Sequence, residues 1–335
     1  GYQLIPEALK RLGLKHILCV RKDIVIDGNF PTVVSPNPEN PEGFALAVEL
    51  AKKNRCDLIV GSDPDADRVG VMVRNAQGEY EVLSGNQTGV LLLDYLIGAK
   101  KRAGTLGEDA YALTTIVSTQ MVDKICAVNH IHTARTFTGF KFLAEKKDAL
   151  EGAGQGKVFF AFEESFGYML GDYVRDKDAV TAIVLIAEMA AWYASQDKTL
   201  YDALQECYAK YGHYGESTIN LVMPGLDGMR DMAAIMEQLH KVPLTEVAGT
   251  AVTAQKDYLS GTVTDPATGV VTPMELKDSN VVAYDLADGT TFIIRPSGTE
   301  PKIKVYVLTH GASQAECDEK LAKYTAFADV IKTMA

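Results

Sequence analysis

Three aspartates stand at alternate positions in the stretch Gly61-Ser-Asp-Pro-Asp-Ala-Asp-Arg68, between the apolar runs 58–60 and 69–73. This pattern indicates a polar loop at the end of a buried strand. Side chains at i, i+2 and i+4 converge where the backbone curls, and converging carboxylates repel unless a cation lies among them. Oxygen donors alone favour a hard ion such as Mg²⁺ over zinc or copper. We therefore predict that Asp63, Asp65 and Asp67 bind Mg²⁺, and that Arg68 suits a phosphoryl group beside it.

Other interpretations of this loop remain open at the level of sequence. An EF-hand is excluded, because it needs Gly at the sixth position and Glu at the twelfth, where this chain has Arg68 and Arg74. A haloacid-dehalogenase-type phosphatase also places paired aspartates after a strand, and Asp63 would then be the nucleophile. A solvated acidic turn is the plain structural alternative, since Asp and Pro are common in turns.

Two more polar loops follow expected strands. Glu163-Glu-Ser-Phe-Gly167 comes after the β-rich run 157–162, and Arg295-Pro-Ser-Gly-Thr-Glu-Pro301 separates the expected strands 290–294 and 302–309. Glycine, hydroxyls and an arginine in one tight turn make a suitable oxyanion pocket, although an ordinary hairpin turn is an equal alternative. Ligands of open α/β sheets collect at strand ends, so we expect the chemistry at these loops.

Composition limits the class of protein. The chain has 335 residues, 47% of them hydrophobic, a net charge of −11 and a pI near 5.1. An acidic surface argues against general binding of nucleic acid or anionic membranes. Five cysteines are odd in number and widely spread, which is typical of thiols in a reducing cytoplasm. We expect a cytoplasmic protein without a membrane span or signal peptide.

Strand and helix patterns alternate over the first two thirds of the chain, and strands dominate the remainder. We expect helices over 5–12, 41–54, 84–101, 178–195, 199–211, 227–240 and 313–333, a strand over His16–Val20, and a hairpin formed by 69–74 and 79–83. Ser84 and Gln87 have the spacing of a capping box. The pattern predicts an α/β fold: two mixed-sheet α/β/α domains followed by a smaller α+β C-terminal domain.

The three loops, in this order, resemble the metal-binding, sugar-binding and phosphate-binding loops of the α-D-phosphohexomutase superfamily, the phosphoglucomutases and phosphomannomutases. The resemblance covers essentially the whole chain. It implies an N-terminally truncated domain 2 over 1–107, domain 3 over 108–213 and domain 4 over 214–335. The family's first domain carries a phosphoserine in a Thr-Ala-Ser-His-Asn-Pro-like loop. No such loop occurs here; Val34-Ser-Pro-Asn-Pro38 is a superficial echo. We therefore expect a fragment whose partner is the missing N-terminal domain of the same protein.

The resemblance assigns a role to individual residues. Asp63, Asp65 and Asp67 would bind Mg²⁺, and Arg68 would lie near the phosphoserine. Substrate contacts would come from a second set of residues, although surface charge is the plain alternative for its last two members: Thr138, Gly139, Lys141, Glu163, Ser165, Arg175 and Lys177. A third set would hold the phosphate that does not react: Arg295, Ser297, Gly298 and Thr299, with Lys302 less clearly a member.

The implied activity is a phosphoglucomutase-like phosphosugar mutase, an isomerase that works through a bisphosphorylated sugar. Phosphopentomutase and phosphomannomutase of the same family are the near alternatives. A Mg²⁺-dependent phosphatase and a stand-alone sugar-phosphate-binding module are the distant ones. The fragment itself is expected to be inactive. The sequence leaves open the preferred sugar, the general acid or base, and whether glucose 1,6-bisphosphate acts as an activator.

Overall fold

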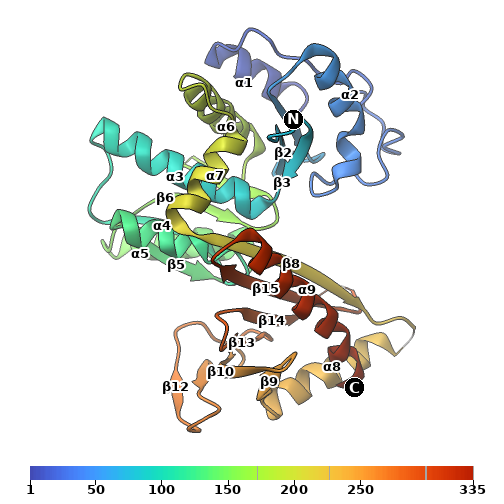
Figure 1. Ribbon diagram of the computed structural model, residues 1–335, viewed down its shortest axis with the longest axis vertical. Coiled ribbons are helices and arrows are strands. Elements are labelled where there is room, and N and C mark those ends of the chain that lie inside the picture. Colours follow the sequence, from blue (N-terminus) through green and yellow to red (C-terminus); the bar gives the residue numbers. More distant parts are fainter. Residues whose placement is uncertain (172, 226, 299, 335) are drawn as a thin grey trace. The chain divides into compact units, whose positions relative to one another are not determined.

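The chain forms two compact units, Gly1–Tyr211 and Gly212–Ala335, in a computed structural model that describes residues 1–171, 173–225, 227–298 and 300–334 (Figure 1). Both units mix helices with sheets, which confirms the predicted fold class of α/β domains followed by a smaller α+β C-terminal part. The three-domain boundaries at 107 and 213 stay a prediction. None of the helices in the described ranges is long and apolar enough to cross a membrane.

The first sheet of unit 1 positions the Asp loop, residues 61–68. It has the order β1-β2-β3 and is antiparallel throughout, with β1 over Leu58–Ser62, β2 over Val69–Arg74 and β3 over Tyr80–Leu83. The predicted hairpin is confirmed as β2 and β3. Five consecutive residues of β2, from Val69 to Val73, are buried, so the chain emerging from the Asp loop is fixed in the core. The helices that precede and follow this sheet are α1 (Leu4–Leu12), η1 (Pro41–Phe44), α2 (Ala45–Asn54) and α3 (Gly85–Ala103).

One predicted strand is wrong. Residues 16–20, all described, form no strand, and Leu18 is half exposed. A short β-prone run becomes a strand only where a partner offers its backbone groups, and this run finds none among the described residues.

The predicted capping box is confirmed at the start of α3. The Ser84 hydroxyl accepts from the Gln87 amide at 3.1 Å, and the Gln87 side chain accepts from the Ser84 amide at 2.8 Å. The next residue must be glycine, because a Cβ at Gly85 would lie 2.0 Å from the Glu164 carbonyl oxygen. The start of α3 therefore abuts the second polar loop.

The second sheet of unit 1 has the order β5-β4-β6-β7. Strands β4 (Ala110–Thr115), β5 (His132–Thr136) and β6 (Lys157–Glu163) are parallel, and β7 (Gly167–Leu170) is antiparallel to β6. The ends of the three parallel strands meet at one edge, so the loops after Thr115, Thr136 and Glu163 are neighbours. The associated helices are α4 (Met121–Asn129), α5 (Phe140–Gly152), α6 (Ala179–Ala194) and α7 (Leu200–Tyr211).

Backbone contacts attach the Asp loop and the start of β2 to the second sheet and to α6. Arg68 and Gly167 form an isolated antiparallel bridge, and the Val69 amide donates to the Phe166 carbonyl at 3.0 Å. The Ala179 amide, at the first residue of α6, donates to the Ala66 carbonyl at 3.0 Å. The metal-binding and sugar-binding loops predicted from the sequence are therefore held together by main-chain hydrogen bonds.

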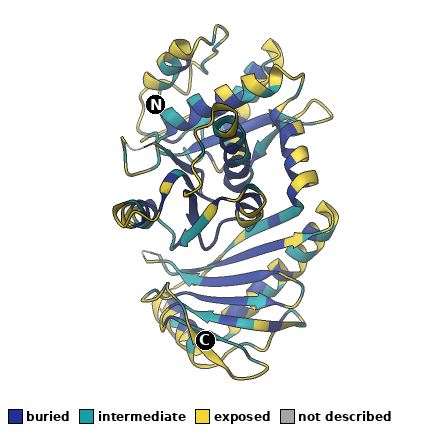
Figure 2. Ribbon diagram, turned by 90° about the vertical axis from the view of Figure 1, so that its left-hand side faces the viewer, coloured by how far each residue is buried: buried dark blue, intermediate teal, exposed yellow. Residues whose placement is uncertain are grey.

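Unit 2 is an antiparallel sheet with helices packed on a shared apolar core. Over the described residues its order is β12-β11-β10-β13-β14-β15-β8, with β9 on β10. Buried side chains of the sheet and of α8 and α9 form one cluster, and Figure 2 shows burial concentrated in the central strands. The bounds are β8 His213–Val222, α8 Gly228–Lys241, β9 Glu246–Val247, β10 Thr250–Asp257, β11 Thr262–Thr264, β12 Val271–Pro273, β13 Val282–Leu286, β14 Thr291–Pro296, β15 Lys302–Gly311, α9 Gln314–Ile331 and η2 Lys332–Met334.

Candidate active site

The three aspartates of the Asp loop converge as the sequence predicts. One carboxylate oxygen from each of Asp63, Asp65 and Asp67 lies within 4.8 Å of the others, and the residues are respectively buried, exposed and half-buried. The turn that brings them together places Ala66 at φ 57°, a left-handed conformation that a non-glycine residue adopts at some cost.

The donor set fits a hard divalent cation. Three oxygens that bind one Mg²⁺ at about 2.1 Å lie roughly 3 to 4 Å from one another, and the observed oxygens are close to that spacing. Carboxylates are the ligands that Mg²⁺ prefers. The Asp loop can therefore hold such an ion.

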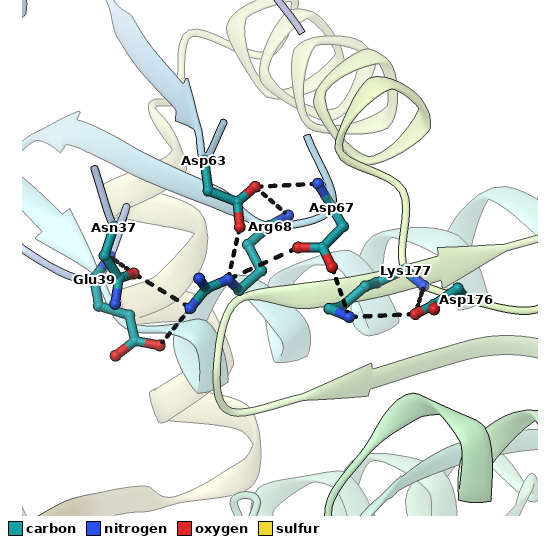
Figure 3. Close-up of polar contacts among 7 residues, drawn as sticks. All are labelled: Asn37, Glu39, Asp63, Asp67, Arg68, Asp176 and Lys177. Carbon is teal, nitrogen blue, oxygen red and sulfur yellow. Dashed lines mark hydrogen bonds and ion pairs between the residues drawn. The ribbon is translucent and has the colours of Figure 1, made fainter. Parts of the chain in front are cut away.

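Asp63 is the anchor of the loop (Figure 3). Its Oδ1 accepts from the amides of Asp67 and Arg68 at 3.1 and 3.0 Å, and its Oδ2 accepts from Arg68 Nε at 2.8 Å. Burial alone would raise the pKa of Asp63, but the hydrogen bonds and charge of Arg68 outweigh it and lower the pKa. Asp63 is therefore ionised at neutral pH.

Arg68 is held in place by residues that sequence reasoning missed. Its Nη1 donates to Asn37 Oδ1 and to Glu39 Oε1, each at 3.4 Å. These two residues stand among Pro36, Pro38 and Pro41, and a polar residue fixed between prolines was the available signal. The segment 34–38, which superficially resembles the phosphoserine loop, thus contributes a hydrogen-bond acceptor for Arg68, the side chain of Asn37.

Lys177 lies on the other side of the Asp loop. Its Nζ is 2.8 Å from Asp67 Oδ2 and 3.3 Å from Asp176 Oδ1 (Figure 3). Burial raises the pKa of Asp67, the charge of Asp63 adds to this, and Lys177 opposes it. Two cations, Arg68 and Lys177, therefore flank the three carboxylates.

The second polar loop lies at the end of β6. Glu163 is buried, its Oε2 accepts from the Gly139 amide at 3.3 Å, and burial, aided by the charge of Glu164, raises its pKa to about 7. This contact joins the predicted loops 138–141 and 163–167. Ser165 lies in the turn between β6 and β7, and the Lys141 Nζ lies 4.8 Å from the centre of the Phe142 ring.

Glu164 was not among the predicted site residues. Its Oε2 accepts from Thr115 Oγ1 at 3.0 Å and from Ser118 Oγ at 3.2 Å. The loop after β4 thereby fixes the turn that carries Glu163 and Ser165. Arg135 in turn donates to the carbonyls of that loop and to Asp123.

The structure separates the predicted basic pair. Lys177 contacts the Asp loop, whereas Arg175 is exposed and forms an ion pair with Asp148 of α5 at 2.8 Å. This placement is the one expected of a surface charge. The assignment of Arg175 to substrate binding stays a prediction.

The predicted phosphate loop lies in unit 2, at the turn between β14 and β15. The Ser297 amide donates to the Lys302 carbonyl at 2.9 Å, and the Glu300 amide donates to the Ser297 hydroxyl at 3.3 Å. Gly298 is exposed, and a Cβ there would meet nothing within 4 Å. Arg295 pairs across the strands with Lys304, and Lys302 forms an ion pair with Glu300. Thr299, also predicted here, lies outside the described residues.

Three family models match consecutive parts of the chain. They are described as phosphoglucomutase/phosphomannomutase α/β/α domain II, matching residues 1–78, α/β/α domain III, matching residues 84–211, and the C-terminal domain, matching residues 219–323.

Curated relatives are identical to this chain at about a third of the aligned positions. A phosphoglucomutase of Staphylococcus aureus strain MRSA252 is 36% identical over 304 residues, which are 91% of this chain and 54% of the relative, and that of strain USA300 is 35% identical over the same shares. The chain therefore spans about half the length of these relatives.

Solved structures share the fold. The phosphoglucomutase pp63/parafusin of Paramecium in its open form has a TM-score of 0.58 at 18% identity, over 90% of this chain and 50% of that one. A phosphoglucomutase/phosphomannomutase family protein of Burkholderia thailandensis has a TM-score of 0.60 at 16% identity, over 92% and 54%.

Proposed function

This chain belongs to the phosphoglucomutase/phosphomannomutase family, and on that premise we propose that it carries the metal-binding, sugar-binding and phosphate-binding parts of a phosphoglucomutase-like phosphosugar mutase. Such an isomerase moves a phosphoryl group between two positions of one sugar through a bisphosphorylated intermediate. The observation that carries the proposal is the group of Asp63, Asp65 and Asp67, whose oxygens lie within 4.8 Å and which is flanked by two cations. Phosphopentomutase and phosphomannomutase activities are the alternatives within the family.

In this proposal the Asp loop binds Mg²⁺, which supplies charge stabilisation to the transferring phosphoryl group. Arg68 adds a second positive charge, oriented by Asp63, Asn37 and Glu39. The geometry suits phosphoryl transfer because such catalysis consists mainly of positioning and of charge stabilisation.

The loops after β5 and β6 bind the sugar. Glu163 accepts hydrogen bonds from sugar hydroxyls when it is ionised, and Ser165 both donates and accepts. Gly139 supports this role by fixing the Glu163 carboxylate through its amide. We assign the remaining substrate contacts to Thr138, Lys141 and Lys177, and Arg175 is the weakest member of the set.

In unit 2 we propose that the turn after β14 binds a phosphate group. Arg295 provides charge, and the Ser297 hydroxyl and the open backbone at Gly298 provide donors within one tight turn. Thr299 completes this set in the resemblance.

As the resemblance implies, we also propose that a phosphoserine outside these 335 residues donates the phosphoryl group, and that glucose 1,6-bisphosphate can regenerate it. The 335 residues by themselves should then bind Mg²⁺ and sugar phosphate without turnover.

A coupled assay with glucose 1-phosphate and Mg²⁺ tests this proposal. The 335 residues are compared alone and joined to a family phosphoserine domain, with mannose and ribose phosphates as competing substrates. We expect turnover only from the joined protein, and a loss of at least about 100-fold on Asp63→Asn, because the anchor of both the metal loop and Arg68 is weakened. Lys52→Met, which breaks a remote ion pair with Glu79, is the matched control and should leave the rate unchanged. Robust turnover by the 335 residues alone would contradict the phosphoserine proposal.

A Mg²⁺-dependent phosphatase with Asp63 as nucleophile is the second candidate, and the geometry disfavours it. Both carboxylate oxygens of Asp63 accept hydrogen bonds from within the loop and from Arg68, which is the arrangement of an anchor and not of a nucleophile presented to a substrate. Borohydride trapping of a phosphoaspartate after incubation with p-nitrophenyl phosphate would decide for the phosphatase.

A further inference from the structure

Lys177 occupies the junction between the Asp loop and the Glu163 loop. Its side chain is 18% exposed, and its ammonium lies 2.8 Å from Asp67 Oδ2. The stem of the lysine passes over Gly167, where a Cβ would lie 2.6 Å from Lys177 Cδ and 3.3 Å from Glu163 Oε1. Gly167 therefore has no side chain at the point where the lysine crosses from one loop to the other.

The two cations that flank the Asp loop are held differently. Arg68 is fixed by Asp63, Asn37 and Glu39 through a planar group that cannot leave one partner without losing the others. Lys177 is a compact charge on a flexible stem, and the ion pairs that it forms are with Asp67 and Asp176. Of the two, Lys177 has fewer polar partners to give up when its ammonium changes position.

The contact with Asp67 has a direct consequence for a metal ion. A carboxylate oxygen that accepts from an ammonium at 2.8 Å offers less charge to a second cation, and the ammonium repels a divalent ion a few ångströms away. We infer that Lys177 competes with the metal for Asp67 and so sets the affinity of the Asp loop for divalent cations. This inference rests on the metal site of the proposed function.

The same geometry couples the metal to the sugar phosphate. A sugar phosphate whose transferring group reaches the Asp loop places negative charge beside Lys177, attracts its ammonium and draws it from Asp67, which then gains affinity for the metal. Because coupling between two binding equilibria is reciprocal, the metal must raise the affinity for the sugar phosphate by the same factor. Lys177 thus links metal binding at the Asp loop to binding of the sugar phosphate.

Isothermal titration of the 335-residue chain with Mn²⁺, alone and with saturating glucose 1-phosphate, tests the inference. We expect Lys177→Met, which keeps the stem and removes the charge, to bind Mn²⁺ alone about tenfold more tightly than the unchanged chain. Lys177→Arg restores a cation and should return the affinity toward that of the unchanged chain. Lys52→Met removes the same charge at a remote ion pair and should change the affinity by less than about twofold.

The coupling is read from the same titrations. Glucose 1-phosphate should raise the Mn²⁺ affinity of the unchanged chain by about fivefold, and Lys177→Met should abolish this increase. Thermal unfolding checks that each variant is folded, and Lys177→Gln replaces the methionine variant if that one is not.

The outcomes separate the inference from the proposed function. If the unchanged chain binds Mn²⁺ and Lys177→Met, or Lys177→Gln in its place, binds it no more tightly, the competition is refuted while the metal site stands. An increase with glucose 1-phosphate that persists in Lys177→Met refutes the coupling. If the unchanged chain binds no Mn²⁺, the metal site of the proposed function fails.

Discussion

At the scale of single residues, Glu163 has the most informative electrostatic environment. It is buried at the end of β6, with Glu164 adjacent in sequence and Lys177 nearby. Burial and the second carboxylate favour the protonated form, and Lys177 opposes them, which leaves the pKa at about 7. The charge of Glu163 therefore changes in the neutral pH range, and the strength with which it accepts hydrogen bonds from hydroxyl groups changes with it.

This environment predicts a pH-dependent stability. The folded pKa of about 7 is above the ordinary value of 4.5, so the stabilisation from the bound proton is complete below pH 4.5 and is lost as the pH rises to about 7. This difference between the two pKa values corresponds to a loss of about 3 kcal/mol in the free energy of unfolding between pH 4.5 and 7. Glu163→Gln keeps the acceptor for Gly139 and should abolish this decline, as measured by urea unfolding at pH 4.5 to 8. Glu145→Gln, at an exposed position of α5, is the control; equal pH profiles for Glu163→Gln and the unchanged chain would contradict the assignment.

At the scale of elements, the start of α6 supports the Asp loop. Asp178 caps the helix, because its carboxylate accepts from the amides of Val180 and Thr181 at 3.0 and 3.1 Å. The amide of Ala179, the first residue of the helix, donates to the Ala66 carbonyl in the Asp loop. The cap therefore fixes the helix end on which Lys177 and the Asp loop depend.

Removing the cap should have a moderate and measurable cost. We expect Asp178→Ala to lower the free energy of unfolding by about 1 kcal/mol, because two amides lose their acceptor. Asp178→Asn keeps an acceptor and should cost less than about half of that. Urea unfolding of the 335-residue chain measures both. Equal losses for the two variants would show that the charge, and not the hydrogen bonds, stabilises the helix start.

Local elements were predictable where both partners lie close in sequence. The capping box of Ser84 and Gln87 spans three residues, and the β2–β3 hairpin spans a short turn, so pattern alone located them. The contacts of Arg68 with Asn37 and of Lys177 with Asp67 join residues about 30 and 110 positions apart. A single sequence carries no distance information for such pairs. The short strands β11 and β12 were missed for another reason, since neither contains a buried residue that would mark a core face.

At the scale of the molecule, unit 2 has a core of its own. Its buried cluster runs from Leu221 to Ile331 and includes Phe292, which is fully buried. The strand that opens the unit, β8, pairs along its whole length with β15. A sheet and two helices around one apolar cluster meet the requirements for independent folding.

We therefore predict that residues 212–335 fold alone. Expressed separately, they should unfold in one cooperative thermal transition. Phe292→Ala should lower the free energy of unfolding by about 3–5 kcal/mol, because it leaves a cavity in the apolar cluster that the sheet shares with α8 and α9. A broad, non-cooperative transition for the unmutated segment would show that unit 2 depends on the rest of the chain.

The main-chain attachment of the Asp loop has a consequence for its dynamics. The amides of Val69 and Ala179 donate to Phe166 and Ala66, so each can exchange its hydrogen with solvent only when the loop detaches from the second sheet or from α6. Their exchange rates therefore report how often the loop opens. A cation bound by the aspartates would slow both amides together, which would let nuclear magnetic resonance detect metal binding without any substrate.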